Sequence, residues 1–441
     1  MATVATEIPQ GAAKADKRDS LAFRALVLFS VVYYARPEDL ISPLKVIPMS
    51  KILGAVCVIG LIAGLSRRRK IKFPLALTFL MLLFGQMILS IPFAYWRGGA
   101  FQMVFSYFAK GVVVAVLVSL LVDTLPQLRK LLFVQAAAVS FMTLASLAAH
   151  NMVAGRLAGA TGGIFENSND LAINIAVNVP FCFAFFLRAR AGIRKAAWLM
   201  AVGAMLVAVL LTYSRSGFLA LVLAGMVCLW EFGVKGRRFH LIVLAVMLSL
   251  LMVGFAPKNY SIRLESIFLG HIPGAIDRGS ADARKELLET SLHLMVQHPL
   301  FGVGPGNFPT FTGVWRVAHN TYAQMGAEVG LPALVLFLLL LGAALNNLFV
   351  AQKSALYKSN LEFRIFTGGL MASMAAYMLG AFFADTAYNL FPYFLVAYTC
   401  ALRRIAELAA VSPSESATPK PATAAVIATP YAGHAGISSR F

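Results

Sequence analysis

The chain has 441 residues, of which 59% are hydrophobic and only 13% are charged, whereas soluble domains carry about 25% charged residues. This composition excludes an ordinary soluble protein and predicts a polytopic membrane protein, because apolar runs of roughly 20 residues recur along the whole length. The formal net charge of +19 would suit a nucleic-acid-binding protein, but the basic residues lie in short clusters between apolar runs. Such clusters face anionic lipids and set membrane topology, so we expect membrane lipids as partners and no nucleic acid.

The apolar runs predict an all-α fold of about twelve transmembrane helices. In chain order the expected spans are 21–36, 49–66, 73–95, 100–122, 131–150, 169–187, 196–213, 216–233, 239–256, 321–350, 365–384 and 386–402. We expect the remaining regions to be a disordered cytoplasmic N-terminus at 1–20, a large loop at 257–320 and a disordered cytoplasmic tail at 405–441, so that helices one to nine occupy 21–256 and helices ten to twelve occupy 321–404. The cysteines fall inside apolar runs, and we expect no disulfide.

Basic connectors follow every second span of this series. They are 66–72, 128–130, 188–195, 235–238, 352–364 and 403–404. Because Lys and Arg are enriched in cytoplasmic connectors, this alternation predicts that both termini are cytoplasmic and that the loop at 257–320 faces the other side of the membrane. Within that loop we expect an amphipathic helix near 281–297, one face of which carries Leu287, Leu288, Ser291, Leu292 and Met295.

Polar residues gather at the span ends that the charge rule places outside the cytoplasm. They are Glu166, Asn169 and Asp170 in "FENSNDLA", Arg215 in "YSRSG", Arg284 in the loop helix, His319, Asn320 and Tyr322 in "AHNTY", and Asp385 and Asn389 before the last span. Each has a structural interpretation: Arg215 could snorkel at the interface, "ENSND" could cap a helix, Arg284 could lie on a solvated helix face, and His319 could be a satisfied interfacial histidine. An arginine in so short a connector is nevertheless costly unless it pairs or binds an anion.

Taken together, these motifs resemble the O-antigen ligase family over about residues 160 to 345. The motifs occur in the family's order: "FENSNDLA", "YSRSG", a large loop with an Arg-bearing helix, "HPLFGVGPGNF" and "AHNTYAQMGAEVGLPAL". The pair formed by "HPLFGVGPGNF" and, about ten residues later, "HNTYAQ" is the most specific part of the resemblance, whereas "SRSG" alone would be weak.

The resemblance implies a GT-C-like membrane glycosyltransferase in the bacterial inner membrane, with 257–320 as a periplasmic loop and the active site facing the periplasm. It implies transfer of a glycan from undecaprenyl diphosphate to the lipid A-core oligosaccharide, without a cofactor. By position, Arg215 and Arg284 are similar to the family's diphosphate-binding arginines and His319 to the histidine proposed to engage the acceptor hydroxyl. We expect these three residues to be catalytic, and Asn320, Tyr322, Asn169 and Glu166 to join the two arginines in binding substrate.

The chemistry of these residues fits the same reaction. Breaking a glycosyl–phosphate bond leaves negative charge on the diphosphate, and guanidinium groups are always protonated and bind such charge in a bidentate manner. Since no acidic motif for a divalent metal is visible, we expect arginines to take the place of Mg²⁺ and no metal site. A neutral histidine can act as the base for an attacking hydroxyl, and attack opposite the diphosphate would invert the anomeric centre.

Three other functions remain open at this stage. A polymerase that extends the glycan on its lipid carrier, or a protein O-oligosaccharyltransferase, would use the same motifs. A lipid-linked sugar transporter belongs to a different class, but the sequence has no internal repeat and its polar residues gather at one membrane face.

Three charged residues have no place in this scheme. Lys110 lies within an expected span, where a charge is a functional candidate by default. Glu38 and Asp39 could supply a first-loop carboxylate, as several lipid-linked glycosyltransferases use, or could cap a short interfacial helix.

Overall fold

The computed structural model describes residues 21–411, except 42, 45–46, 48, 66–72, 162–164, 166, 242, 244–246, 248–277 and 314–316. The expected disordered N-terminus, most of the expected ninth span and Glu166 therefore lie outside the described residues.

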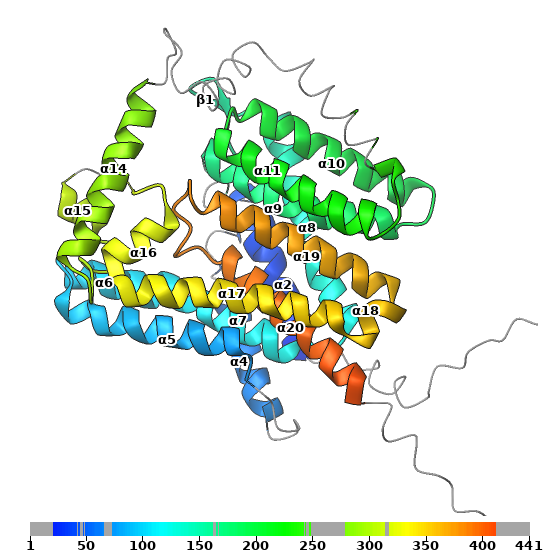
Figure 1. Cartoon of the computed structure of the whole chain (residues 1–441), viewed down its shortest axis with the longest axis horizontal. Helices are drawn as coiled ribbons and strands as arrows, with labels where there is room; N and C mark the ends of the chain where they lie inside the picture. Colours follow the sequence, from blue (N-terminus) through cyan, green and yellow to red (C-terminus); the bar gives the residue numbers. More distant parts are fainter. Residues whose placement is uncertain are drawn as a thin grey trace, which may run out of the picture.

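The described chain is a bundle of helices with one short hairpin (Figure 1). The helices before the loop are α2 (Leu21–Ala35), α3 (Pro37–Leu40), α4 (Met49–Leu65), α5 (Leu75–Ser90), η2 (Ile91–Phe93), α6 (Arg97–Gln102), η3 (Met103–Phe108), α7 (Ala109–Leu121), α8 (Leu125–Ala148), α9 (Ser168–Arg188), α10 (Ile193–Leu211), α11 (Arg215–Cys228) and η5 (Leu229–Val234). Those that follow are α14 (Arg278–Gln297), α15 (Phe308–Thr312), α16 (Thr321–Val329), α17 (Leu331–Lys353), α18 (Ala355–Ser359), α19 (Leu361–Gly380) and α20 (Phe391–Val411). The hairpin pairs β1 (Met152–Val153) with β2 (Arg156–Leu157).

Seven helices of the described chain are long and apolar enough to cross a membrane. They are Leu75–Phe93, Arg97–Leu121, Leu125–Ala148, Ser168–Arg188, Ile193–Leu211, Arg215–Val234 and Leu331–Lys353. Two shorter apolar helices, Leu21–Ala35 and Met49–Ala63, accompany them. The protein is thus an all-α polytopic membrane protein, as the composition predicts, whereas the count of twelve spans and the GT-C-like fold stay predictions.

Close helix contacts in the bundle are made through small residues. α9 packs against α8, α10, α11 and α19, and most of its length is buried. A Cβ atom on Gly217 of α11 would lie 2.2 Å from the Cβ of Ala172 of α9, so only glycine permits these two backbones to approach so closely. Small residues are the usual means by which membrane helices pack tightly. This contact brings the start of α11 beside the start of α9.

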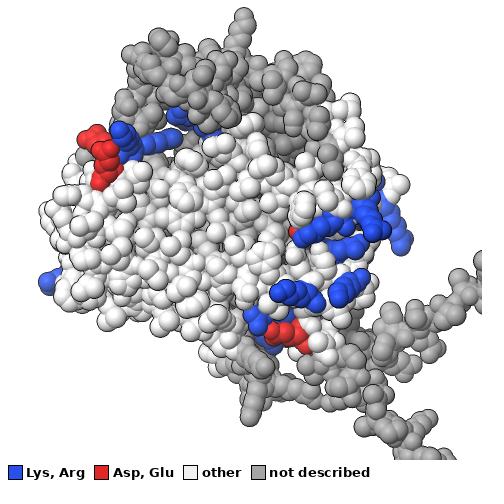
Figure 2. Space-filling view, viewed as in Figure 1, with Lys and Arg blue, Asp and Glu red and all other residues white. Residues whose placement is uncertain are grey.

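The charges are distributed unequally between the two ends of the bundle. Figure 2 shows Lys and Arg side chains gathered at the end where α18 and the last turns of α20 lie. The opposite end, which holds α6, α14, α15 and α16, is called the outer end below. Its visible charges lie chiefly over the exposed side of α14 (Figure 2). This is the distribution that the positive-inside rule expects if the outer end faces away from the cytoplasm.

The expected tenth span is wrong at its beginning. The chain between 321 and 350 does not form one helix, because α16 ends at Val329 and a new helix, α17, begins at Leu331. Gly330 separates them with a φ of 94°, in the region that only glycine adopts readily, and Pro332 occupies the first turn of α17. The motif "NTYAQMGAEV" therefore lies on a short helix outside the spans, packed against α14.

Other boundaries differ by smaller amounts. α8 begins at Leu125 rather than 131, because Thr124 and Gln127 form a reciprocal capping box, and the basic connector 128–130 belongs to its first turns. α20 continues to Val411, beyond the expected end at 404. The helix expected near 281–297 is confirmed as α14, which starts slightly earlier, at Arg278.

Candidate functional site

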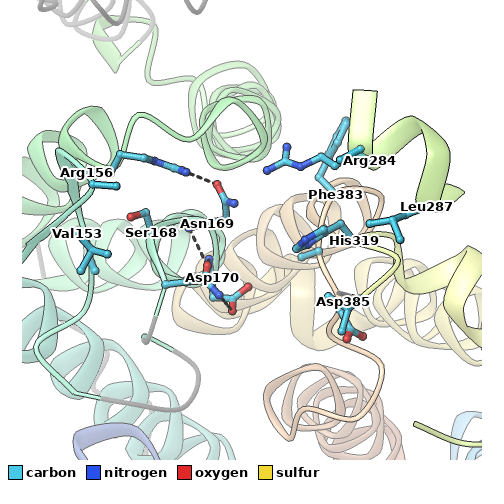
Figure 3. A pocket seen from close by; sticks show the side chains of 16 residues that line it. Val153, Arg156, Ser168, Asn169, Asp170, Arg284, Leu287, His319, Phe383 and Asp385 are labelled. Atoms are coloured by element: carbon cyan, nitrogen blue, oxygen red, sulfur yellow. Dashed lines mark hydrogen bonds between the residues drawn. The ribbon is translucent and has the colours of Figure 1, made fainter. Parts of the chain in front are cut away.

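A cavity of about 910 Å³ opens at the outer end of the bundle (Figure 3). Its walls come from segments that are far apart in sequence: the β1–β2 hairpin, the start of α9, the first half of α14, the segment before α16, and the loop between α19 and α20. The lining residues are Val153, Ala154, Arg156, Ala158, Asn167, Ser168, Asn169, Asp170, Ala283, Arg284, Leu287, Val317, His319, Phe383, Ala384 and Asp385.

Arg156 is the arginine of the hairpin wall. Ala154 and Gly155 have φ values of 50° and 71°, the left-handed conformations of a tight two-residue turn, and this turn starts β2 directly with Arg156. The guanidinium is held at two points. Its Nε donates to the carbonyl of Thr212 at 2.8 Å, and Nη2 donates to Oδ1 of Asn169 at 2.7 Å. Arg156 is therefore fixed in its orientation before any ligand binds.

Asn169 links the hairpin to the "YSRSG" motif. Its Oδ1 also accepts a hydrogen bond from the hydroxyl of Ser214 at 2.9 Å. Ser214 is the N-cap of α11 and accepts a hydrogen bond from the backbone of Gly217 at 3.2 Å. Asn169 thus lines the cavity, as expected for a substrate-binding candidate, and it also orients Arg156.

Arg215 does not line this cavity. It is the first residue of α11 and lies partly buried, one residue after the serine that caps the helix. The described structure therefore brings Arg156, rather than Arg215, into one cavity with Arg284, and the role expected of Arg215 stays a prediction. The capping geometry explains the difference, because Ser214 rather than its neighbour turns toward Asn169.

Arg284 and His319 do lie together on the wall opposite Arg156. In Figure 3 the guanidinium groups of Arg284 and Arg156 point toward one another across the cavity. The imidazole of His319 lies below the guanidinium of Arg284. Arg284 lies one helical turn before Leu287, on the face of α14 that is buried further along, as Leu287 at 7% and Leu294 at 3% exposure indicate. At Arg284 this face opens onto the cavity. Two positive groups and a potential base therefore face the same space.

The backbone of His319 has an uncommon conformation. Its φ is 50°, a left-handed value that histidine adopts more readily than most residues but that still stores strain. The chain on both sides is held in place: Ala318 is buried, and Thr321 donates its backbone N–H to the carbonyl of Ala381 at 2.8 Å. The surrounding fold thus fixes the direction in which the imidazole points.

Asn320 and Tyr322, expected to bind substrate, make hydrogen bonds within the local structure. Asn320 is the N-cap of α16, and its Oδ1 accepts from the backbone N–H groups of Tyr322 and Ala323, both at 3.0 Å. The hydroxyl of Tyr322 donates to the carbonyl of Met378 at 2.8 Å. Neither side chain lines the cavity. A role of Asn320 and Tyr322 in binding substrate stays a prediction, beside the capping and packing contacts that their polar groups make.

Two carboxylates complete the cavity wall. Asp385 lies in the loop between α19 and α20, on the same side as His319, and Asp170 lies in the first turn of α9 (Figure 3). Desolvation, followed by the negative charges of Glu328 and Asp170, raises the pKa of Asp385 well above its ordinary value. The cavity thus has two parts. The guanidinium groups face one another in one part, and the two carboxyl groups lie below them in Figure 3.

Glu328 of α16 lies fully buried behind this wall. Its carboxylate accepts from the backbone N–H of Gly306 at 3.0 Å and of Phe308 at 3.1 Å, from Nε2 of Gln324 at 3.3 Å, and from the hydroxyl of Tyr388 at 2.6 Å. Burial raises its pKa to about 6, while these hydrogen bonds act in the opposite direction. Glu328 therefore ties the "GVGPGNF" loop and the Asp385 loop to the helix that follows His319.

The remaining charged candidates lie elsewhere. Lys110 is exposed, with its Nζ 5.5 Å from the centroid of the Tyr107 ring. Asp39 forms an ion pair of 2.5 Å with Arg36. None of these residues, nor Glu38, lines the cavity. Among the described residues, no group of three or more His, Cys, Asp or Glu side chains is arranged to hold a metal ion.

Sequence reasoning missed Arg156 and Phe383. The signal for Arg156 was present in "NMVAGRLAG", where an Ala-Gly pair between short apolar segments is compatible with a hairpin turn that places a neighbouring arginine at the outer end. Phe383 carries no comparable signal, because it lies in the apolar run that predicts the span at 365–384.

Comparison with known protein families gives one match. The family described as O-antigen ligase matches residues 199–338, from α10 to the first turns of α17. The matched region includes Arg215, Arg284 and His319 but not Arg156 or Asp385. A search of curated proteins found no match to the chain.

Proposed function

Residues 199–338 of the chain belong to the O-antigen ligase family, and from that premise we propose that the protein is an O-antigen ligase of the bacterial inner membrane. It transfers a glycan from undecaprenyl diphosphate to the lipid A-core oligosaccharide on the periplasmic face. The observation that carries this proposal is the facing pair of arginines beside His319 (Figure 3).

The donor's diphosphate binds between Arg156 and Arg284. A guanidinium presents a planar set of N–H donors that matches phosphate oxygens in a bidentate manner, and it keeps its charge at every physiological pH. Arg156 is held by Thr212 and Asn169, so little of its freedom is lost on binding. As the sugar departs, the same groups stabilise the negative charge that develops on the leaving diphosphate.

His319 acts as the general base. The acceptor hydroxyl gives its proton to an imidazole nitrogen while its oxygen forms the new bond to the anomeric carbon. The bond between that carbon and the diphosphate oxygen breaks, and its electron pair leaves on undecaprenyl diphosphate. Because the hydroxyl attacks from the face opposite the leaving group, the anomeric configuration is inverted. A base of this kind typically contributes about 10²–10⁴-fold to the rate.

The carboxyl groups at the other end of the cavity suit sugar hydroxyls. Asp170 and Asp385 line the wall away from the facing guanidinium groups, so they lie on the sugar side of a bound diphosphate. The raised pKa of Asp385 favours its protonated form, which both donates and accepts hydrogen bonds. Such a group can orient a hydroxyl without repelling the diphosphate.

The test is a three-way assay of the purified protein in nanodiscs. The protein is incubated with an undecaprenyl-diphosphate glycan and rough lipopolysaccharide, and the products are separated on a gel. A ligase shifts the lipopolysaccharide band. Lengthening of the donor glycan alone identifies a polymerase, modification of an added acceptor protein identifies a protein O-oligosaccharyltransferase, and movement of intact donor across vesicles without transfer identifies a transporter. Each of these last three results overturns the ligase assignment.

A further inference from the structure

The exposed side of α14 changes character along the helix. Along the stripe formed by positions 285, 289, 292 and 296, the first two side chains are charged: Lys285 and Glu289 are 77% and 67% exposed, and their charged groups lie 3.8 Å apart. The next two are aliphatic, with Leu292 at 49% and Val296 at 78% exposure, and Leu300 just beyond the helix is 62% exposed. Beside this stripe His293 and Gln297 are also exposed, and their side chains form a hydrogen bond of 2.9 Å with each other. Leu292, Val296 and Leu300 thus expose aliphatic side chains at one end of the segment, next to a polar stripe.

The opposite side of α14 is fixed by close packing. Leu287, Leu294 and Met295 are buried there. A Cβ on Gly326 of α16 would lie 2.3 Å from Cε of Met295, so the two helices are in direct contact. The helix cannot rotate to bury Leu292 or Val296 without breaking this contact.

The aliphatic segment is joined directly to two membrane spans. The carbonyl of Pro299 accepts from the backbone N–H of Leu331, the first residue of α17, at 2.7 Å. The carbonyl of Leu300 accepts from Nε2 of Gln86 of α5, also at 2.7 Å. On these spans Leu89 and Val335 are exposed apolar residues. The lipid-facing surface of α5 and α17 therefore continues onto Leu300 and, from there, onto α14.

Aromatic residues lie next to the segment that carries Leu300. The turn between α5 and α6 exposes Tyr95 and Trp96, and the backbone N–H of Tyr95 donates to the carbonyl of Val303 at 2.9 Å. Phe93 stacks on Phe301 with ring centroids 4.3 Å apart. Exposed Trp and Tyr at the end of a span are typical of the boundary between hydrocarbon and headgroups. This boundary therefore passes close to the segment that carries Leu300.

We propose that the outer leaflet of the bilayer covers Leu292, Val296 and Leu300, so that the last turns of α14 are anchored in the membrane interface. The preceding turns, with Lys285 and Glu289, stay in water. An interfacial helix normally buries its apolar side in the headgroup and acyl boundary, and here the other side is already occupied by α16. The same helix carries Arg284, so the membrane also sets the position of one cavity wall.

The test places an environment-sensitive NBD fluorophore on single added cysteines in protein reconstituted into phosphatidylcholine–phosphatidylglycerol nanodiscs. Val296→Cys and Leu292→Cys report on the proposed anchor, and Lys285→Cys is the matched control on the same helix. The native cysteines are buried, so the unsubstituted protein serves as the labelling blank. Quenching is measured with doxyl-labelled lipid and with aqueous iodide.

At positions 292 and 296 we expect lipid quenching at least threefold stronger than at 285, and iodide quenching at least threefold weaker. Equal quenching by iodide at all three positions would overturn the proposal, because the segment would then lie in water. Protection at 292 and 296 from both quenchers would also overturn it, since a protein surface, such as a second copy of the chain, would then cover the segment. The readout needs no transfer reaction, so it is independent of the proposed function.

Discussion

The hydroxyl of Thr321 donates a hydrogen bond to the carbonyl of Ala384 across 2.7 Å and accepts one from the backbone N–H of Thr386 at 3.1 Å. Thr321 lies two residues after His319, and Ala384 and Thr386 flank Asp385. One buried hydroxyl therefore holds the loop with the cavity carboxyl against the segment with the histidine. Its removal should disturb the relation between these two walls without removing any group from the cavity.

Thr321→Val should slow transfer about tenfold while the donor KM changes little. Valine has the same shape but leaves the Ala384 carbonyl and the Thr386 N–H without their buried partner, which costs about 1–3 kcal/mol. Steady-state kinetics with the lipid-linked donor measure the effect, and Thr321→Ser, which restores the hydroxyl, should recover most of the rate. If valine at this position supports the wild-type kcat, Thr321 does not position the cavity walls.

Arg156→Ala should raise the donor KM by at least tenfold. The substitution removes one of the two guanidinium groups that face the proposed diphosphate position, and charge-assisted hydrogen bonds of this kind contribute about 1.5–3 kcal/mol each. Arg190→Ala is a matched control, because it removes the same charge from an exposed position in a basic connector. A donor KM that is unchanged for Arg156→Ala but raised for Arg215→Ala would show that the original expectation for Arg215 was the better one.

His319→Asn should lower kcat by about 10²–10³-fold while donor binding survives. Asparagine tolerates the left-handed backbone conformation found here, so the variant removes the base with little change in local strain. Donor binding is followed by a fluorescent analogue and transfer by the gel shift of lipopolysaccharide. Parallel losses of binding and transfer would indicate that His319 supports the fold of the cavity rather than the proton transfer.

Transfer should proceed at an unchanged rate in EDTA. The reason is that two arginines face the position at which charge develops on the leaving group, so this stabilisation does not require a divalent ion. The rate is measured before and after chelation, with Mg²⁺ or Mn²⁺ added back. Activity that disappears in EDTA and returns with either ion would contradict the proposed role of the arginines.

The sequence predicted those features that depend on composition and periodicity. Apolar runs identify the spans, and the spacing of Leu287, Leu288, Ser291, Leu292 and Met295 identifies α14. Leu292, expected on the same face as the others, is exposed in the structure. The sequence failed where a single residue decides the outcome: Gly330 breaks the tenth expected span, although glycine inside an apolar run is common in membrane helices. Periodicity cannot reveal a backbone angle that only the packed fold imposes.

For the candidate site, the sequence placed residues at the correct end but did not determine which side chains face the cavity. Arg284, His319 and Arg156 line it, whereas Arg215 lies outside its lining. The choice depends on Ser214, whose hydroxyl both caps α11 and donates to Asn169. Such a choice depends on contacts between segments about 45 residues apart, as the separation of Asn169 and Ser214 indicates, and a single sequence gives no signal for it.

Glu328 should make the protein less stable as the pH rises from about 4.5 to 6. Burial raises its pKa from 4.5 to about 6, so in this range the folded protein keeps a proton that the unfolded chain has released. The free energy of unfolding then falls with increasing pH, by about 2 kcal/mol for a shift of this size, and becomes independent of this group above about pH 7. Below about 4.5 the group is protonated in both states and contributes no slope.

The measurement is the thermal unfolding midpoint in detergent from pH 4 to 8 for the wild type and for Glu328→Gln. Glutamine has the same shape but does not titrate, so the advantage of the wild type over the variant should shrink as the pH rises from about 4.5 to 6. In both proteins Asp385 also makes the free energy of unfolding fall with increasing pH, because its pKa is raised as well. Removing the charge of Glu328 lowers the pKa of Asp385. The pH range in which the variant's free energy of unfolding falls should therefore move to lower pH. Parallel curves for the two proteins over the whole range would contradict the titration of Glu328 in this window.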